Sequence, residues 1–203
     1  SKKIGIMKKY FFVLSIIAAT VLFTSCAKAP QAEMDAAKAA IEQAKAAQAD
    51  LYLEADFLAV QDSLNATLVA IEAQKSKMFG SYGEAKEKLA TITAQATELV
   101  AKTDVRKEEI KGEVAAAQAA ITTMMEENTK MVEMAPKGKE GKEAIEAIKV
   151  DLAGISASVA EVPALVESGD LLGAQTKITA AQQKATEINT ELKTVLEKAG
   201  KKF

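Results

Sequence analysis

The sequence contains no histidine and no tryptophan, and its 203 residues include one cysteine and one arginine. Without histidine, the chain lacks the side chain that most often serves as a general base at neutral pH and as a metal ligand. The lone cysteine, Cys26, has no partner in the chain for a disulfide. With Arg106 as its only arginine and a formal charge of −2, the chain does not offer the concentrated basic surface that nucleic acid requires. We therefore expect no nucleic-acid partner.

One long hydrophobic run lies close to the N-terminus. It extends over 14 residues, from Tyr10 to Phe23, and follows the basic pair Lys8-Lys9. The run is too short to cross a bilayer core of ~30 Å as a helix, but it suits the hydrophobic region of a secretion signal. We expect translation to start at Met7, with residues 1–6 as an upstream extension.

The residues that follow this run, Thr24-Ser25-Cys26, resemble the lipobox of bacterial lipoproteins. The resemblance implies that residues 1–25 are a cleaved signal peptide, that Cys26 is acylated on its sulfur and new amino group, and that residues 26–31 form a short lipidated tether. The alternative is an ordinary signal peptide with an incidental cysteine. Cleavage would leave 178 residues and, with four lysines removed, a formal charge of −6. The expected location is the cell envelope of a Gram-negative bacterium, on the periplasmic face of the outer membrane.

The remainder of the sequence predicts helix almost throughout. Alanine, glutamate, lysine and glutamine dominate, and all favour helix. Apolar residues recur at alternating spacings of three and four, which places them on one stripe of a helix that must be buried against other helices. No segment shows the period of two that is typical of a half-buried strand. The clearest stripes are Phe57, Leu64, Ile71 and Met78; Ile145, Ile148, Leu152, Ile155, Val159, Val162 and Val166; and Leu171, Ala174, Ile178, Ala181, Ala185, Ile188, Leu192 and Val195.

Turn signals divide these helices. Gly80 is expected to end one helix, and Ser81 with Glu84 has the spacing of a capping box that begins the next. Gly169 is expected to end a later helix, with Asp170 as the N-cap of its successor. The predicted helices are residues 31–50, 54–79, 82–133, 140–168 and 170–199.

The sequence also contains an internal repeat. Residues 80–99 match residues 169–188 at a constant spacing of 89, including the pairs Gly80/Gly169 and Leu89/Ile178. We therefore predict an all-α, elongated antiparallel helical bundle with coiled-coil-like heptads. It would consist of two tandem three-helix units, residues 32–112 and 113–203, that share a long central helix.

The motifs Pro30-x-x-Glu33-Met34-x-x-Ala37 and Gly80-Ser81-Tyr82-Gly83-Glu84-Ala85 resemble the domain of unknown function 4398 family. The resemblance covers roughly residues 30–112 and, more faintly, residues 113–198. It implies alanine-rich helical modules of bacterial envelope lipoproteins, and it brings no catalytic residue. The stretch Tyr52-Leu53-Glu54-Ala55 departs from the family, which often has a proline in this turn.

Four groups of residues are candidate sites, and each has a simpler structural interpretation. Clustered methionines provide the soft thioethers that Cu(I) prefers, but they also fill helical cores. Neighbouring glutamates suggest acid–base chemistry, yet adjacent helical residues point in different directions, so solvated surfaces are expected. Aromatic residues at the helix ends are expected to plug the first bundle, with a binding patch as the alternative, and a lysine-rich turn is expected to be a solvated loop. The groups are Met124, Met125, Met131 and Met134; Glu108-Glu109 and Glu126-Glu127; Tyr52, Phe57, Phe79 and Tyr82; and residues 137–142.

Taken together, the residues favour a protein without catalytic activity. There is no histidine, no free thiol once Cys26 is acylated, and no glycine-rich phosphate loop. We expect no catalytic residue, no cofactor, no metal and no small-molecule substrate. The expected role is structural: an adaptor held on the membrane by its lipid anchor that contacts an envelope protein or a second copy of itself. The alternative is a periplasmic carrier or chaperone that holds an apolar ligand or an unfolded client between its helices.

Overall fold

The computed structural model describes residues 28–203. The expected signal peptide and the lipidation site at Cys26 lie outside the described residues. The described part contains helices and no strand, so the all-α prediction is confirmed. None of its helices has both the length and the apolar character needed to cross a membrane. The helices are α2 (Gln31–Ala46), α3 (Ala49–Tyr52), α4 (Glu54–Lys75), α5 (Gly83–Met134), α6 (Lys139–Ser168) and α7 (Leu171–Lys198).

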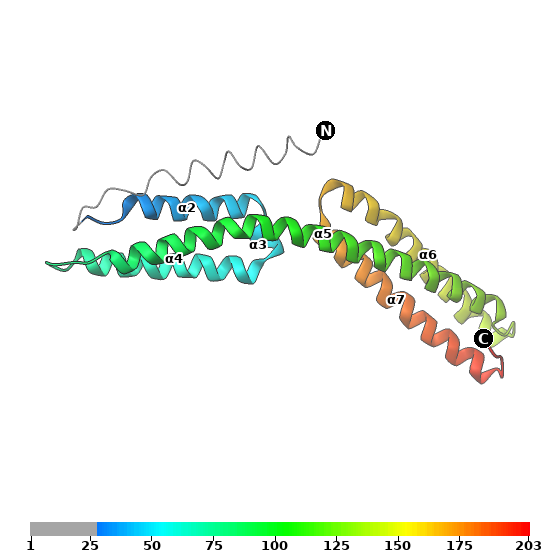
Figure 1. Ribbon diagram of the computed structural model, residues 1–203. Helices are drawn as coiled ribbons and strands as arrows, with labels where there is room; N and C mark the ends of the chain where they lie inside the picture. The colour runs from blue at the N-terminus through cyan, green and yellow to red at the C-terminus, as the bar shows by residue number, and fades with distance from the viewer. Residues whose placement is uncertain (1–27) are drawn as a thin grey trace, which may run out of the picture.

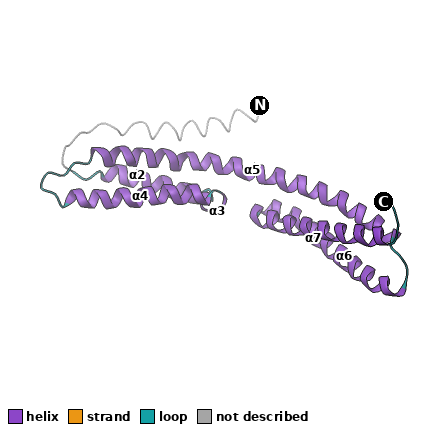
Figure 2. Ribbon diagram, turned by 90° about the horizontal axis from the view of Figure 1, so that it is seen from below, coloured by secondary structure: helices purple, strands orange, loops and turns teal. Residues whose placement is uncertain are grey.

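The helices form an elongated rod of two three-helix bundles (Figure 1). Helices α2 and α4 pack on the N-terminal half of α5, whereas α7 packs on its C-terminal half and α6 packs mainly on α7. Seen from below, α5 extends along the whole rod and joins the two bundles without interruption (Figure 2). Its 52 residues span about 78 Å at a rise of 1.5 Å per residue. The predicted shared central helix is confirmed.

Each bundle has its own hydrophobic core. The first core extends along the chain from Met34 to Leu99, and the second from Ile110 to Leu196. Between them on α5 lies Thr103, which is fully buried and donates its hydroxyl hydrogen to the Leu99 carbonyl oxygen over 2.7 Å. The interruption of apolar residues on α5 thus coincides with the transition from one bundle to the other.

The heptad stripes identify most of the core. On α6 the buried stripe residues are Ile148, Leu152, Ile155 and Val162, as predicted. Several core positions are alanines with no exposed surface, which lets the helices approach closely: Ala37, Ala44, Ala96, Ala174 and Ala185. Two assignments require correction. Met78 is 91% exposed because α4 ends before it, and on α7 Leu196, rather than Val195, is fully buried.

The turn between α6 and α7 forms as predicted. Gly169 adopts a left-handed conformation with φ of +86°, which favours glycine, and it ends α6. The Asp170 carboxylate caps α7 by accepting a hydrogen bond from the Gly173 N–H over 2.9 Å. A Cβ atom at position 173 would lie only 2.2 Å from an oxygen of this carboxylate. The cap therefore depends on glycine at position 173, a requirement that the cap spacing alone does not show.

The turn between α4 and α5 differs from the prediction. Helix α4 ends at Lys75 rather than near residue 79, and α5 begins after Tyr82, whose side chain makes no capping bond. The predicted capping box of Ser81 and Glu84 is wrong, because Ser81 lies one residue before the N-cap position. Its backbone N–H instead donates to the Gln74 side-chain oxygen over 3.1 Å.

The predicted helix 31–50 is interrupted. Gln48 has a φ of +70° and separates α2 from the single turn α3. The Ala47 and Gln48 N–H groups donate to the Gln43 and Lys45 carbonyls, which completes the hydrogen bonding at the end of α2. Nothing in the alanine-rich sequence indicates this break, because Gln48 itself favours helix.

Candidate functional site

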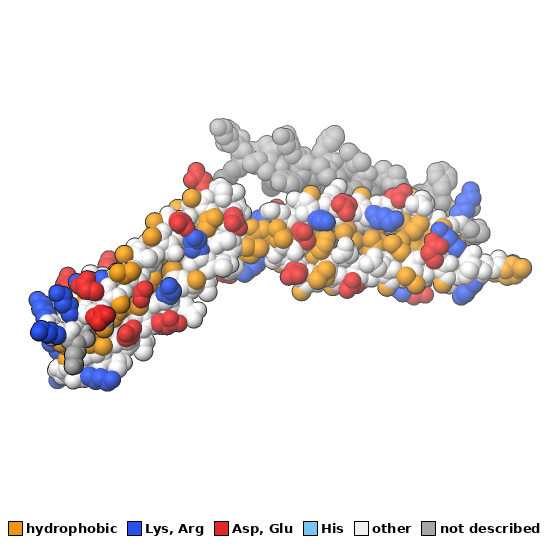
Figure 3. All heavy atoms as spheres, turned by 180° about the vertical axis from the view of Figure 1, so that it is seen from behind, with side chains coloured by type: hydrophobic (Ala, Val, Ile, Leu, Met, Phe, Trp, Pro, Cys, Tyr) orange, Lys and Arg blue, Asp and Glu red, His pale blue; other side chains and the backbone are white. Residues whose placement is uncertain are grey.

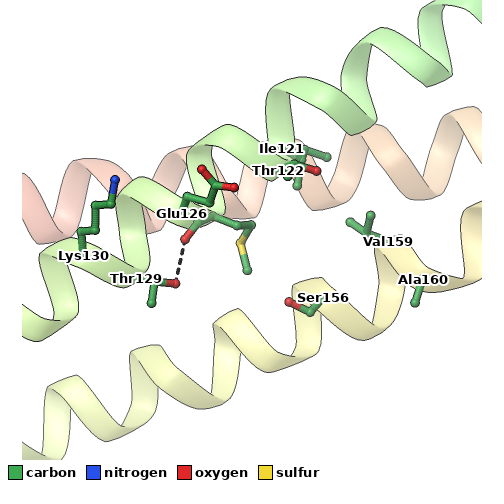
Figure 4. Close-up of a pocket in the computed structure, with 9 residues that line it drawn as sticks. Ile121, Thr122, Glu126, Thr129, Lys130, Ser156, Val159 and Ala160 are labelled. Atoms are coloured by element: carbon green, nitrogen blue, oxygen red, sulfur yellow. Dashed lines mark hydrogen bonds between the residues drawn. The ribbon is translucent and has the colours of Figure 1, made fainter.

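The clearest concave surface lies between α5 and α6. Helix α7 packs closely against both, whereas α5 and α6 make far fewer contacts with each other. The space between them forms a groove of about 650 Å³, to which both helices contribute side chains (Figure 4). The groove is lined by Ile121, Thr122, Met125, Glu126, Thr129, Lys130, Ser156, Val159 and Ala160.

The groove has apolar walls near its base and polar groups along its rim. Ile121 is buried, and Met125 and Val159 are half-buried, so an apolar occupant would gain contact with all three. Glu126 and Lys130 are exposed and lie one turn apart on α5. This arrangement fits an apolar chain or an amphipathic helix, and it provides no nucleophile with an adjacent base.

The methionines do not converge on one point. Met131 is buried in the second core, and Met124, Met125 and Met134 pack partly against the same core. The Met124 sulfur lies 3.5 Å from the Thr186 hydroxyl on α7, whereas Met125 lines the groove toward α6. The structure therefore uses these side chains as packing residues. Among residues 28–203, no group of three or more His, Cys, Asp or Glu side chains is placed to hold a metal ion.

The glutamate pairs lie on solvated surfaces, as expected, and three of the four glutamates form ion pairs. Glu108 pairs with Lys111 over 2.7 Å, and Glu109 pairs with Arg106 over 3.2 Å. Glu127 binds Lys193 of α7 over 3.2 Å, and this ammonium, together with the Asn189 amide, lowers the pKa of the Glu127 carboxyl. Both effects favour the ionised form of the Glu127 carboxyl.

The four aromatic residues have different environments, and only Phe57 is buried in the first core. Tyr82 packs partly against that core, but Phe79 is 92% exposed, so the prediction that it plugs the bundle is wrong. Tyr52 instead packs against the second core and donates its hydroxyl hydrogen to the Gly169 carbonyl over 3.3 Å. The Lys107 ammonium lies 5.1 Å from the centre of the Tyr52 ring. Tyr52 therefore links the two bundles.

Sequence reasoning missed a buried polar pair between α5 and α7. Asn128 is fully buried and Asn189 is 7% exposed. The Asn189 amide donates to the Asn128 side-chain oxygen over 2.8 Å, and the Asn128 amide donates to the Ala185 carbonyl over 3.0 Å. A polar residue inside an apolar stripe fixes helix register in coiled coils. Asn128 lies four residues after Met124 and three residues before Met131, in the spacing of an apolar stripe, and this was the signal that could have revealed the pair.

The two ends of the rod differ in character. At the end of the first bundle, which we call the N-terminal end, the start of α2 lies beside the turn of residues 76–82 (Figure 1). At the opposite end, which we call the basic end, lysine side chains gather around the α5–α6 turn and the end of α7 (Figure 3). The exposed lysines of the basic end are Lys137, Lys139, Lys142, Lys198, Lys201 and Lys202.

No known protein family, no curated protein and no solved structure matches this chain. The resemblance to the domain of unknown function 4398 family stays a prediction from the sequence.

Proposed function

We propose that the chain is a non-catalytic, lipid-anchored adaptor of the bacterial envelope, on the periplasmic face of the outer membrane. Lipid attached to Cys26 would hold the N-terminal end of the rod at the bilayer, because the described chain begins at that end with residue 28. The rod would then present its basic end to an envelope partner. The observation that carries this proposal is the continuous helix α5, which connects the two ends.

The length of α5 gives the adaptor its reach. The 52 residues of α5 have a contour length of about 78 Å, and the helix bends between the two bundles (Figure 1). Hydrophobic cores on both halves support it, so it does not stand as an isolated helix in water. An upright rod would therefore place the basic end at most about 80 Å from the membrane surface.

The basic end favours an acidic partner. It carries six exposed lysines and three exposed glutamates, Glu133, Glu143 and Glu197, on two chain segments that meet at one tip, so positive charge is in excess there. Complementary charge accelerates encounter and selects partners, even where each exposed ion pair adds little affinity. Such a tip suits an acidic protein surface or another anionic polymer of the envelope.

Membrane attachment is tested by the variant Cys26→Ala. The wild-type chain should incorporate a fatty-acid label and fractionate with the outer membrane, whereas the variant should remain unlabelled. An unlabelled wild-type chain that still carries residues 1–25 would contradict the anchor.

The adaptor role is tested by photo-crosslinking in intact cells. A photoreactive residue at Lys139 or Lys202 should trap one discrete partner. The matched control places the same residue at Val69, which is 70% exposed on α4 and distant from the basic end. Equal crosslinking at all three positions would contradict a specific role for the basic end.

The groove supports a second candidate, a carrier of an apolar ligand. Val159 lines the groove, whereas Val150 lies on the same helix and is 71% exposed. A bound lipid or fatty acid should appear by native mass spectrometry in the wild-type chain and in Val150→Asp, but not in Val159→Asp. The absence of any co-purified ligand from all three proteins would count against the carrier.

A further inference from the structure

The turn between α4 and α5 exposes two large apolar side chains at its tip. Met78 and Phe79 are 91% and 92% exposed, more than any other large hydrophobic residue among residues 28–203. Single exposed apolar residues are common on protein surfaces. Two consecutive, almost fully exposed residues at a loop tip are different, because such tips usually carry small or polar side chains.

The hydrogen bonds of the turn hold these side chains outward. The Lys77 N–H donates to the Gln74 carbonyl over 3.1 Å, and the Ser81 N–H donates to the Gln74 side chain over 3.1 Å. Gly80 lies so close that a Cβ atom there would be 2.4 Å from the same Gln74 carbonyl oxygen. The chain is thus attached to the end of α4 on both sides of Met78 and Phe79. These contacts fix the turn in the conformation that exposes both side chains.

The turn lies at the end of the rod from which the N-terminal segment continues. Pro30 is buried there and Lys28 is exposed. Only three residues lie between Cys26 and Pro30, and the four residue steps from one to the other reach at most about 14 Å when fully extended. An anchor at Cys26, or the hydrophobic run before it, therefore brings this end of the bundle to the surface of the bilayer.

We propose that Met78 and Phe79 insert into the bilayer beside the lipid anchor, so that the rod is attached at two points rather than one. This inference rests on the proposed lipid anchor. Apolar side chains gain free energy when they leave water for the hydrocarbon boundary. The exposed Lys77 has a long side chain whose ammonium can remain at the headgroups while its neighbour inserts. Two attachment points would also limit how far the rod tilts.

The absence of tryptophan provides a direct test. The full-length protein with Phe79→Trp would be purified from membranes and reconstituted into vesicles of phosphatidylethanolamine and phosphatidylglycerol. The control is Val150→Trp, an exposed position (71%) in the second bundle. With brominated lipids, Trp at position 79 should lose fluorescence and emit at shorter wavelength, whereas Trp at position 150 should remain unquenched.

The other outcomes are distinguishable. If the protein floats with the vesicles but Trp at position 79 is unquenched, the inserted turn is overturned and the lipid anchor stands. A shift to shorter wavelength without quenching would show that a second copy or another protein covers the turn, which also overturns the inference. Quenching at both positions would show a rod lying flat on the membrane, contrary to attachment at one end. Failure to float would overturn the anchor and the inserted turn together.

Discussion

The buried pair of Asn128 and Asn189 provides the sharpest test of how the second bundle is held together. The substitution Asn128→Ala removes two side-chain hydrogen bonds between α5 and α7. Each is worth about 0.5–1.5 kcal/mol net, so the two together contribute about 1–3 kcal/mol, and the Asn189 amide keeps only its interaction with the Glu127 carboxylate. We expect a loss of about 2 kcal/mol in the free energy of unfolding, beyond the gain from alanine's helix propensity.

The melting temperature reports this loss and also the unit that unfolds. A loss of 1 kcal/mol shifts the midpoint by about 4–8 °C for a domain of 60–100 residues and by about 2–4 °C for one of 150–250 residues. If the second bundle unfolds alone, Asn128→Ala should lower its midpoint by about 8–16 °C. If both bundles unfold together, the decrease should be about 4–8 °C. Far-UV circular dichroism and calorimetry measure both.

Two controls isolate the buried pair. Asn65→Ala makes the same chemical change at an exposed position of α4, and it should be neutral or slightly stabilising. The double variant Asn128→Leu/Asn189→Leu leaves no polar group unpaired and should retain most of the stability. A midpoint for Asn128→Ala within about one degree of the wild type would refute the reasoning, because the expected loss is several times larger.

Three further predictions address other parts of the rod. Ile155→Asp places a charge in the second core, where Ile155 is 3% exposed, so the second bundle should unfold; an unchanged melt would contradict its placement. Tyr52→Ala removes the hydrogen bond that links the first bundle to Gly169, so the two bundles should unfold more independently of each other. Calorimetry should then resolve two unfolding transitions that lie further apart in temperature than those of the wild type. The Arg106 guanidinium lowers the pKa of the Glu113 carboxyl, so this contribution to stability is complete above pH 4.5 and is lost as the pH falls through the lowered pKa. Glu113→Gln should therefore make the melting temperature less sensitive to acid below pH 4.5, and an identical pH profile would refute the role of this pair.

Local chemistry explains why much of the fold was predictable. Heptad spacing identified the buried stripe of α6, and Gly169 with Asp170 identified its end and the start of α7. These features depend on residues within one or two helical turns. The α4–α5 turn was predicted incorrectly because its bonding returns to Gln74, seven residues before Ser81, and no local motif encodes that contact.

The candidate sites were less predictable, because they depend on which helices pack together. The apolar stripes of α5, α6 and α7 each require burial, but the spacing of their residues does not predict which helices pack together. It therefore does not predict that α5 and α6 remain apart and leave a groove. The same holds for Tyr52, whose role at the junction depends on a partner 117 residues away. Cys26, the one site residue named from the sequence, lies outside the described residues, and its lipidation stays a prediction.

The sequence alone determined that residues 28–203 are helical, and it determined most helix boundaries and the stripes that are buried. It could do so because helix propensity, capping and periodicity act over a few neighbouring residues. The tertiary structure decided how each stripe is satisfied: two separate cores along one continuous helix, the Asn128–Asn189 pair between α5 and α7, and the outward turn at Met78 and Phe79. The hydrophobic effect is not directional, so an apolar stripe requires burial but does not select the helix that buries it. Only the packing of the whole chain selects that helix.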